Sequence, residues 1–258
     1  MNTSLPWQTQ RAIRESMGFS AIVDINGVHN PKTGGFHLAQ DAVEAGHKSI
    51  FVRNGTYPGM TFTSAKKGTD FTIVGESIAG VIIDGESTRS SVFMSTGATR
   101  NRIERMTLRT TSGAGVYWGG VFDSGAGYNQ YVDLHCDECD YHAFFLNTST
   151  STNNLLLRCR ATEDNGTQDG SGFYINCHKC QIINCFAEGC GVDGFNGLAP
   201  GDDMLWLGNH ARDNAGTGLI INSGADNHVI VGNRCTNNTS AELADNSGTG
   251  TSSGNDTT

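Results

Sequence analysis

The sequence predicts an all-β protein whose chain winds into a single-stranded parallel β-helix. Five segments lie over one another at spacings of 23 to 26 residues, and their anchor positions are Cys136, Cys159, Cys185, Asn209 and Asn233. Within each segment apolar residues alternate with polar ones, as in a strand with one buried face. A unit of this length cannot bury its own apolar face, so the units must stack on one another.

A second strand recurs in the same units. It reads AFFLN from Ala143, GFYIN from Gly172, GFNGL from Gly194 and GLIIN from Gly218. Two or three short strands joined by Gly, Asn and Asp turns fit a repeat of about 24 residues, whereas a β-propeller blade needs ~40 or more. The 34 glycines supply tight corners, and only 4 prolines interrupt backbone pairing between coils.

Three stretches carry a family resemblance. Residues 37–62, which contain HLAQDAVEAGHKSIFVRNGTYPGMTF, and residues 70–87 resemble the opening of pectin-lyase-like right-handed parallel β-helix proteins. The resemblance covers roughly residues 36–250, and it implies a right-handed stack whose first coil follows a short N-terminal capping helix. Residues 237–255 resemble the last coil of bacteriophage tail and tailspike β-helices.

The repeat indicates one solenoid with extensions at both ends. We expect residues 1–35 to form an attachment or capping segment, residues 36–240 the parallel β-helix, and residues 241–258 the last coil and a Gly/Ser/Thr-rich tail. The N-terminus has no apolar signal-peptide core, and no run of 18 apolar residues occurs. We therefore expect a virion location, in the tail or on the surface, or otherwise an extracellular one, with no membrane insertion.

The net charge and the cysteine spacing indicate which ligands and partners the protein binds. A net charge of −9 without a cluster of Lys and Arg argues against nucleic acid as a partner. The spacings Cys136-x-x-Cys139 and Cys177-x-x-Cys180 are compatible with zinc ligation or disulfides. The repeat register instead favours buried thiols that fill the core. We expect no metal and no cofactor.

Four large apolar side chains stand three residues before successive anchors. Unbroken alternation through the anchor would turn this column outward, which is more apolar surface than a soluble monomer usually exposes. The tailspike resemblance implies a homotrimer with this stripe at its interface, and the alternative is a cover formed by residues 1–35 or 241–258. The predicted interface residues are Leu156, Ile182, Trp206 and Ile230.

The position after each anchor forms another outward column. It contains Arg160, Phe186, His210 and Arg234, which could receive an acidic glycan: the ring would stack on a sugar and the guanidinium groups would bind carboxylates. The alternative is an ordinary solvated face with one exposed Phe.

The turn column four residues after the anchors is acidic. On adjacent coils Asp140 and Glu163 would lie about 5 Å apart, and Glu163 and Asp213, two coils apart, about 10 Å. The first separation is that of a retaining glycosidase pair, and the second is near the limit for an inverting pair. These three residues are the catalytic candidates, although turns are acidic for many other reasons.

Taken together, the patterns favour a virion surface or tail protein, tailspike-like or fibre-like, whose partners are its own copies, other virion proteins and host-cell polysaccharide. The alternative is a polysaccharide lyase or glycoside hydrolase of the pectin-lyase-like superfamily that acts on an acidic glycan. A third hypothesis is a structural virion component without a ligand. Asp202-Asp203 resembles the paired aspartates of polygalacturonases, but the other motifs of that family are missing.

Overall fold

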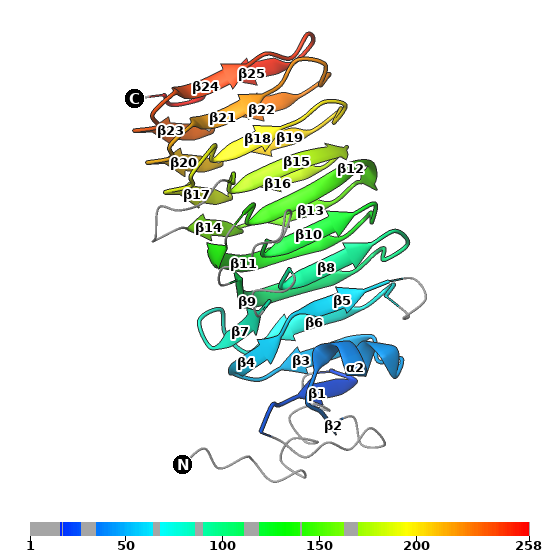
Figure 1. Cartoon of the computed structure of the whole chain (residues 1–258). Helices are drawn as coiled ribbons and strands as arrows, with labels where there is room; N and C mark the ends of the chain where they lie inside the picture. Colours follow the sequence, from blue (N-terminus) through cyan, green and yellow to red (C-terminus); the bar gives the residue numbers. More distant parts are fainter. Residues whose placement is uncertain are drawn as a thin grey trace.

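The protein is a parallel β-solenoid of about eight turns, which confirms the predicted fold (Figure 1). The computed structural model describes residues 16, 18–26, 35–63, 68–85, 90–110, 119–139, 141–162 and 170–257. One short helix, α2 (Ala39–Glu44), lies at the N-terminal end of the stack and buries Ala39, Ala42 and Val43. It is the predicted capping helix.

The coils contribute strands to three sides, and the strands of the described residues pair in parallel. Strands β9 (Arg102–Thr110) and β11 (Gln130–Cys139) each run through a corner and belong to the first and second sides. The first side further contains β1 (Ala21–Val23), β2 (Gly35–Phe36), β3 (Ser49–Val52), β6 (Thr72–Gly75), β13 (Leu155–Leu157), β16 (Gln181–Ile183), β19 (Leu205–Leu207), β22 (Val229–Val231) and β25 (Thr251–Ser253).

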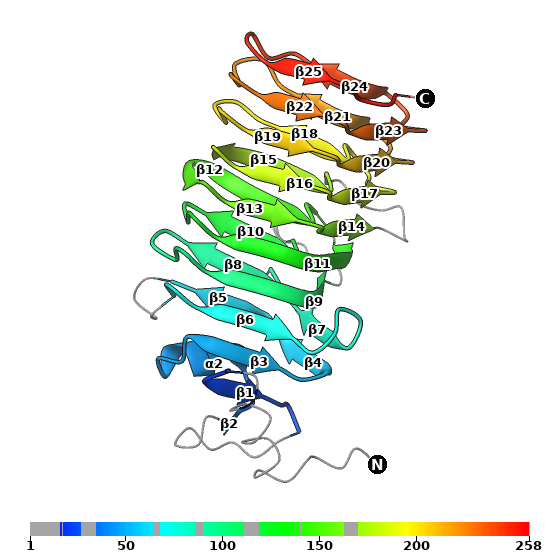
Figure 2. The ribbon, with the colours of Figure 1, turned by 180° about the vertical axis from the view of Figure 1, so that it is seen from behind.

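The second side consists of shorter strands, and Figure 2 shows its last four beside those of the first side. Its members besides β9 and β11 are β4 (Gly55–Pro58), β7 (Val81–Asp84), β14 (Arg160–Thr162), β17 (Phe186–Glu188), β20 (His210–Arg212) and β23 (Arg234–Thr236). The third side contains β5 (Met60–Phe62), β8 (Val92–Ser95), β10 (Val121–Ser124), β12 (Phe144–Thr152), β15 (Phe173–His178), β18 (Phe195–Gly197), β21 (Thr217–Ile221) and β24 (Ala241–Asp245).

The stack extends into both predicted end segments. Strand β1 belongs to the expected N-terminal segment, and it already pairs with β3 of the solenoid. Strand β24 belongs to the expected C-terminal segment and pairs with β21. No helix in the described part of the chain is long and apolar enough to cross a membrane.

Single residues in the left-handed conformation make the corners. Between the first and second sides these are Arg158, Asn184, Gly208 and Gly232, with φ angles of 52°, 51°, 63° and 62°. The residue after each of them is an anchor, and its side chain points inward. A left-handed residue bends the strand, so the alternation of inward and outward side chains restarts on its far side.

This restart overturns the predicted outward stripe. Leu156, Ile182, Trp206 and Ile230 are each 0% exposed and form one continuous column inside the solenoid. The prediction carried the alternation through the corner residue. In the structure two residues, Leu157 and the corner residue Arg158, lie between the inward side chains of Leu156 and Cys159. The outward positions of these strands are the residues on either side of the stripe, such as Leu205 and Leu207 around Trp206.

The anchor column is a core ladder, as predicted. Cys159, Cys185, Asn209 and Asn233 are each 1% exposed, and the backbone N–H of Cys185 donates to Asn209 Oδ1 at 2.9 Å. The backbone N–H of Asn209 donates in turn to Asn233 Oδ1 at 2.9 Å. The prediction was wrong for Cys136, which is buried but pairs with Ala161, two residues beyond Cys159, and so lies outside this column.

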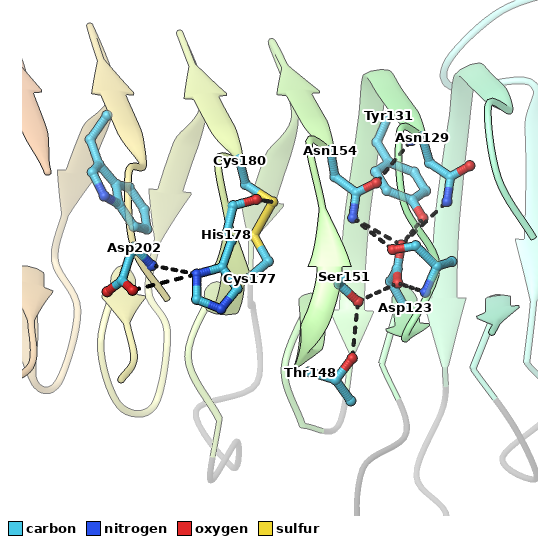
Figure 3. Close-up of a disulfide and its surroundings, with 12 residues drawn as sticks. Asp123, Asn129, Tyr131, Thr148, Ser151, Asn154, Cys177, His178, Cys180 and Asp202 are labelled. Carbon is cyan, nitrogen blue, oxygen red and sulfur yellow. Dashed lines mark hydrogen bonds and ion pairs between the residues drawn. A yellow bond between two sulfur atoms is a disulfide. The ribbon is translucent and has the colours of Figure 1, made fainter. Parts of the chain in front are cut away.

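The cysteines divide into two groups. Six are free and buried: Cys136, Cys139, Cys159, Cys185, Cys190 and Cys235. Cys177 and Cys180 form a disulfide across the corner between the third and first sides (Figure 3), so the disulfide alternative holds for this pair. Among the described residues no cluster of three or more His, Cys, Asp or Glu side chains could hold a metal ion.

Candidate functional site

The predicted glycan column exists as a structural unit on the second side. The strand register places Arg160, Phe186, His210 and Arg234 in line on successive coils. Both arginines are exposed, while the Phe186 and His210 side chains are half-buried. The placement of the column is confirmed, and its role stays a prediction.

Two neighbouring residues, Glu188 and Arg212, determine the charge of this column and the access to its aromatic ring. The sequence analysis did not find them. Glu188 accepts hydrogen bonds from Arg160 Nη2 at 3.2 Å and from Arg212 Nε at 2.6 Å. The two guanidinium carbons lie 5.0 and 5.4 Å from the centre of the Phe186 ring. Because Arg160 and Arg212 come from the coils before and after it, the ring is bracketed by guanidinium groups. A sugar could stack on Phe186 only by displacing one of them.

The rest of the column is also matched in charge. Arg234 pairs with Asp256 at 3.5 Å. Burial, followed by the charges of Arg234 and Arg212, lowers the pKa of His210, so this ring is neutral at pH 7. His210 Nε2 has no hydrogen-bond partner among the described residues. With Asp213, which lies 3.8 Å from Arg212, three carboxylates face the three guanidinium groups, so the column has no excess of positive charge for an acidic ligand.

The catalytic candidates are only partly placed. Asp140 and Glu163 lie outside the described residues. Asp213 is exposed at a corner with a φ of 56°, in line with Gly189 and Asn237, and one of its oxygens lies 3.8 Å from Arg212 Nε. The carboxylate pair therefore stays a prediction.

The structure contains a groove that the sequence analysis did not find. It has a volume of about 530 Å³ and is open to solvent at the corner between the third and first sides. We call it the Tyr128 groove. It is lined by Thr72, Arg100, Asn101, Arg102, Tyr128, Gln130, Asn153, Asn154, Leu155 and Gln181.

Tyr128 is the exposed aromatic side chain of this groove. It is 56% exposed and occupies a left-handed corner position with a φ of 60°. This conformation is unfavourable for a bulky residue, so the surrounding structure must hold it. A tyrosine presents an apolar ring face together with a hydroxyl group, a combination suited to the C–H faces and hydroxyls of a sugar.

Guanidinium and amide groups surround the tyrosine. Arg100 is held by Asp70 through two hydrogen bonds of 2.6 and 2.9 Å, and the Arg100 guanidinium lowers the pKa of that carboxyl. Arg102 donates to Gln130 Oε1 at 2.7 Å. Asn153 and Gln181 add amides, each able to donate and accept. A fixed array of donors and acceptors beside a ring can recognise a polyhydroxylated ligand.

A column of asparagines forms the inner wall of the groove. The backbone N–H of Asn101 donates to Asn129 Oδ1 at 3.0 Å, and that of Asn129 donates to Asn154 Oδ1 at 2.8 Å. The residues just before these asparagines are Arg100, Tyr128 and Asn153, which form the outer rim. Aligning the chain on these buried asparagines would have revealed the groove from the sequence.

Solved structures similar to this chain include the following two. The mannuronan C-5 epimerase A-module of Azotobacter vinelandii aligns with a TM-score of 0.51 and 15% identity over 88% of this chain and 58% of its own. The ORF18 protein of Geobacillus virus E2 aligns with a TM-score of 0.51 and 12% identity over 88% of this chain and 54% of its own. The fold is that of right-handed parallel β-helix proteins. This β-helix spans little more than half the length of either protein. No protein-family model and no curated protein matches the sequence.

Proposed function

We propose that this β-helix is a virion surface or tail protein that binds a host-cell glycan along its side. The observation that carries the proposal is the Tyr128 groove, in which an exposed ring lies among amide and guanidinium groups on a rigid stack. Strands fix the spacing of these groups, so little ordering is required on binding. The likeness to a Geobacillus virus protein supports the virion context at the level of the fold.

The groove is the better candidate for the glycan site than the Arg160 column. In the column the aromatic ring is covered by guanidinium groups, whereas Tyr128 is more than half exposed. The groove is also concave, which lets several groups contact one ligand at once. The Arg160 column could extend the contact surface of a long polysaccharide on the adjoining side.

Replacing Tyr128 by Ala is expected to weaken glycan binding by about tenfold or more, since an aromatic contact in a partly desolvated site contributes roughly 1–3 kcal/mol. The measurement is glycan-array screening followed by titration calorimetry with the best oligosaccharide. Lys179→Ala is the matched control, because Lys179 occupies the same corner position, with a φ of 56°, outside the groove. Equal binding by wild type and Tyr128→Ala would remove the groove as the glycan site.

We also propose that copies of the chain associate through the outward face of the first side. Seven of the eight outward positions on β13, β16, β19 and β22 are apolar, and Leu207 and Val229 are 37% and 40% exposed. The resemblance to tailspikes favours a trimer of parallel stacks with this face buried. Leu155 also lines the Tyr128 groove, so the interface consists of the other six residues and leaves the groove open. These six are Leu157, Ile183, Leu205, Leu207, Val229 and Val231.

Leu207→Asp is expected to shift the wild-type trimer toward smaller species, because it would bury a charge without a partner in the interface. Analytical ultracentrifugation measures the change, and circular dichroism should report an intact β-sheet. Ile78→Asp is the control, since Ile78 is 40% exposed away from this face. A monomeric wild type would contradict the proposal, and so would a trimer that tolerates Leu207→Asp.

The alternative function is that of a polysaccharide lyase or hydrolase acting on an acidic glycan. One contact favours it: His135 Nε2 and Thr162 Oγ1 lie 2.6 Å apart, and Thr162 Oγ1 donates to Asp137 Oδ1 at 3.4 Å. Such a chain of one buried hydroxyl and two half-buried side chains could move a proton at the second side. Incubation with acidic bacterial polysaccharides separates the two functions, since only an enzyme would produce reducing ends or unsaturated uronates.

A further inference from the structure

A buried carboxylate lies directly behind the Tyr128 groove. Asp123 on β10 is 0% exposed, and its side chain points into the solenoid. The register places it between Met94 on β8 and Leu146 on β12, in a column that is otherwise apolar at this level. Burying a carboxylate there is unfavourable unless hydrogen bonds compensate. The fold alone would be served by another apolar residue.

Three groups from the corner that carries Tyr128 donate hydrogen bonds to this carboxylate (Figure 3). They are the backbone N–H of Ala126 at 3.0 Å, Asn129 Nδ2 at 3.4 Å and the Tyr131 hydroxyl at 3.0 Å. Tyr128 lies between the first and second of them in the chain. One carboxylate thus ties down both arms of the corner whose tip is the exposed tyrosine.

The next coil is tied to the same carboxylate. Ser151 Oγ donates to Asp123 at 2.8 Å and Asn154 Nδ2 donates at 3.3 Å. These residues flank Asn153, which lines the groove beside Tyr128. Asp123 therefore connects the two coils that form the middle of the groove wall.

We propose that Asp123 is a positioning residue that holds the Tyr128 groove in its binding shape, so that its protonation weakens glycan binding. This inference rests on the proposed function and extends it to the regulation of the same site. Asp123 does not touch the ligand, and it acts through Asn129, Asn154 and the corner backbone.

The electrostatic surroundings place this protonation in an accessible range. Burial is the main cause that raises the pKa of Asp123 to about 6, and the hydrogen bonds from Ser151 and Tyr131 oppose the rise. Tyr131 faces it from β11, and burial holds the pKa of this phenol well above 10. The thiol of Cys159 contacts the Tyr131 carbonyl, and burial raises its pKa as well, so both groups keep their protons. Met94 and Leu146 add no charge.

Protonation disturbs the donor set because a neutral carboxyl must itself donate. The atoms that face it are one backbone N–H, the Nδ2 donors of two side-chain amides and two hydroxyls, and of these atoms only the oxygens of Ser151 and Tyr131 can accept. The accepting hydroxyl then has to turn its own proton elsewhere. Thr148 Oγ1 lies 3.4 Å from Ser151 Oγ and can take that bond. The hydrogen bonds from Ala126, Asn129 and Tyr131 then end on a neutral carboxyl in place of a carboxylate, which weakens each tie between Asp123 and the corner.

The expected effect follows from the fraction of ionised Asp123. If only the ionised form has the binding shape, a pKa of about 6 makes the apparent dissociation constant about tenfold weaker at pH 5 than at pH 7. The free energy of unfolding should change with pH in the opposite direction to the glycan affinity. The pKa of Asp123 in the folded protein exceeds its ordinary value of 3.8, so its contribution to stability is complete below pH 3.8 and is lost as the pH rises through about 6.

The test uses the full chain labelled with ¹³C-tyrosine, since only 6 tyrosines are present and Tyr128→Phe assigns the resonance. In wild type the Tyr128 ring resonance should shift with a midpoint near pH 6, and in Asp123→Asn this transition should be absent. Tyr131→Phe is the second variant. It removes one donor to the ionised form and should therefore move the midpoint to higher pH while the fold persists.

Binding and stability complete the test, with a glycan array and an oligogalacturonate hexamer as probes. Wild type should lose about tenfold in affinity for a bound probe from pH 7 to pH 5, and Asp123→Asn should be weak and independent of pH. As the pH rises from 5 to 7, the melting temperature of wild type should fall relative to that of Asp123→Asn. A Tyr128 resonance that does not shift between pH 5 and 7 would overturn the positioning role. A shifting resonance without any glycan binding would support that role and overturn the proposed ligand.

Discussion

Replacing Trp206 by Ala is expected to lower the free energy of unfolding by about 3–5 kcal/mol. Trp206 is a fully buried side chain, with its ring 6.3 Å from that of Phe195 in an edge-to-face arrangement. The substitution would leave a cavity between β18 and β19. It would also remove the hydrogen bond that the indole N–H donates to His228 Nδ1 at 3.4 Å. Urea unfolding followed by circular dichroism measures the loss.

Leu207→Ala is the matched control for this prediction. Leu207 is the next residue on the same strand, points outward and is 37% exposed, so its truncation should cost less than about 1 kcal/mol in a monomer. The measurement is made at a protein concentration low enough to dissociate any oligomer. Equal losses for the two variants would mean that Trp206 does not occupy the core.

The direction in which Trp206 points illustrates what the sequence can predict. The repeat length, the ladder of Cys159, Cys185, Asn209 and Asn233, and the capping helix all follow from local pattern and resemblance. Which side chains of the strand before the ladder point inward does not follow from this pattern, because one left-handed residue at the corner reverses the alternation. Arg158 and Asn184 stand at such corners without the glycine that would announce a positive φ. Alternation is therefore reliable within a strand and fails across a corner.

The candidate sites show the same limit. The outward column Arg160, Phe186, His210 and Arg234 could be predicted, because it lies beyond the corner on one strand per coil. Its partners Glu188 and Arg212 change its chemistry, and both belong to a neighbouring column two residues further along. The Tyr128 groove depends on coils of unequal length, since the inner asparagines 101, 129 and 154 are 28 and 25 residues apart. An alignment anchored on Cys136 and the later cysteines begins after Asn101 and Asn129, so it does not align these two asparagines.

The interior asparagines contribute to stability through backbone groups that would otherwise be unpaired. Asn209 is 1% exposed, and its Oδ1 accepts the backbone N–H of Cys185 at 2.9 Å. Its Nδ2 donates to the Ile182 carbonyl at 2.9 Å and to Asn233 Oδ1 at 3.0 Å. Each corner of the coil leaves such groups without a strand partner, so the side-chain amide completes the pairing.

Asn209→Ala is therefore expected to cost about 2–6 kcal/mol of unfolding free energy, since it leaves a buried N–H and a buried carbonyl unpaired at roughly 1–3 kcal/mol each. Urea unfolding gives the total, and amide hydrogen exchange at Cys185 should accelerate specifically. The control is Asn255→Ala at the open end of the same ladder, where Asn255 accepts from the backbone N–H of Asn233 at 2.9 Å. Asn255 is only half-buried, so water can replace its amide there and the loss should stay near or below about 1 kcal/mol. If both variants lost the same stability, burial of the ladder would not be what makes its hydrogen bonds valuable, and the cost of Asn209→Ala would have to come from lost packing volume instead.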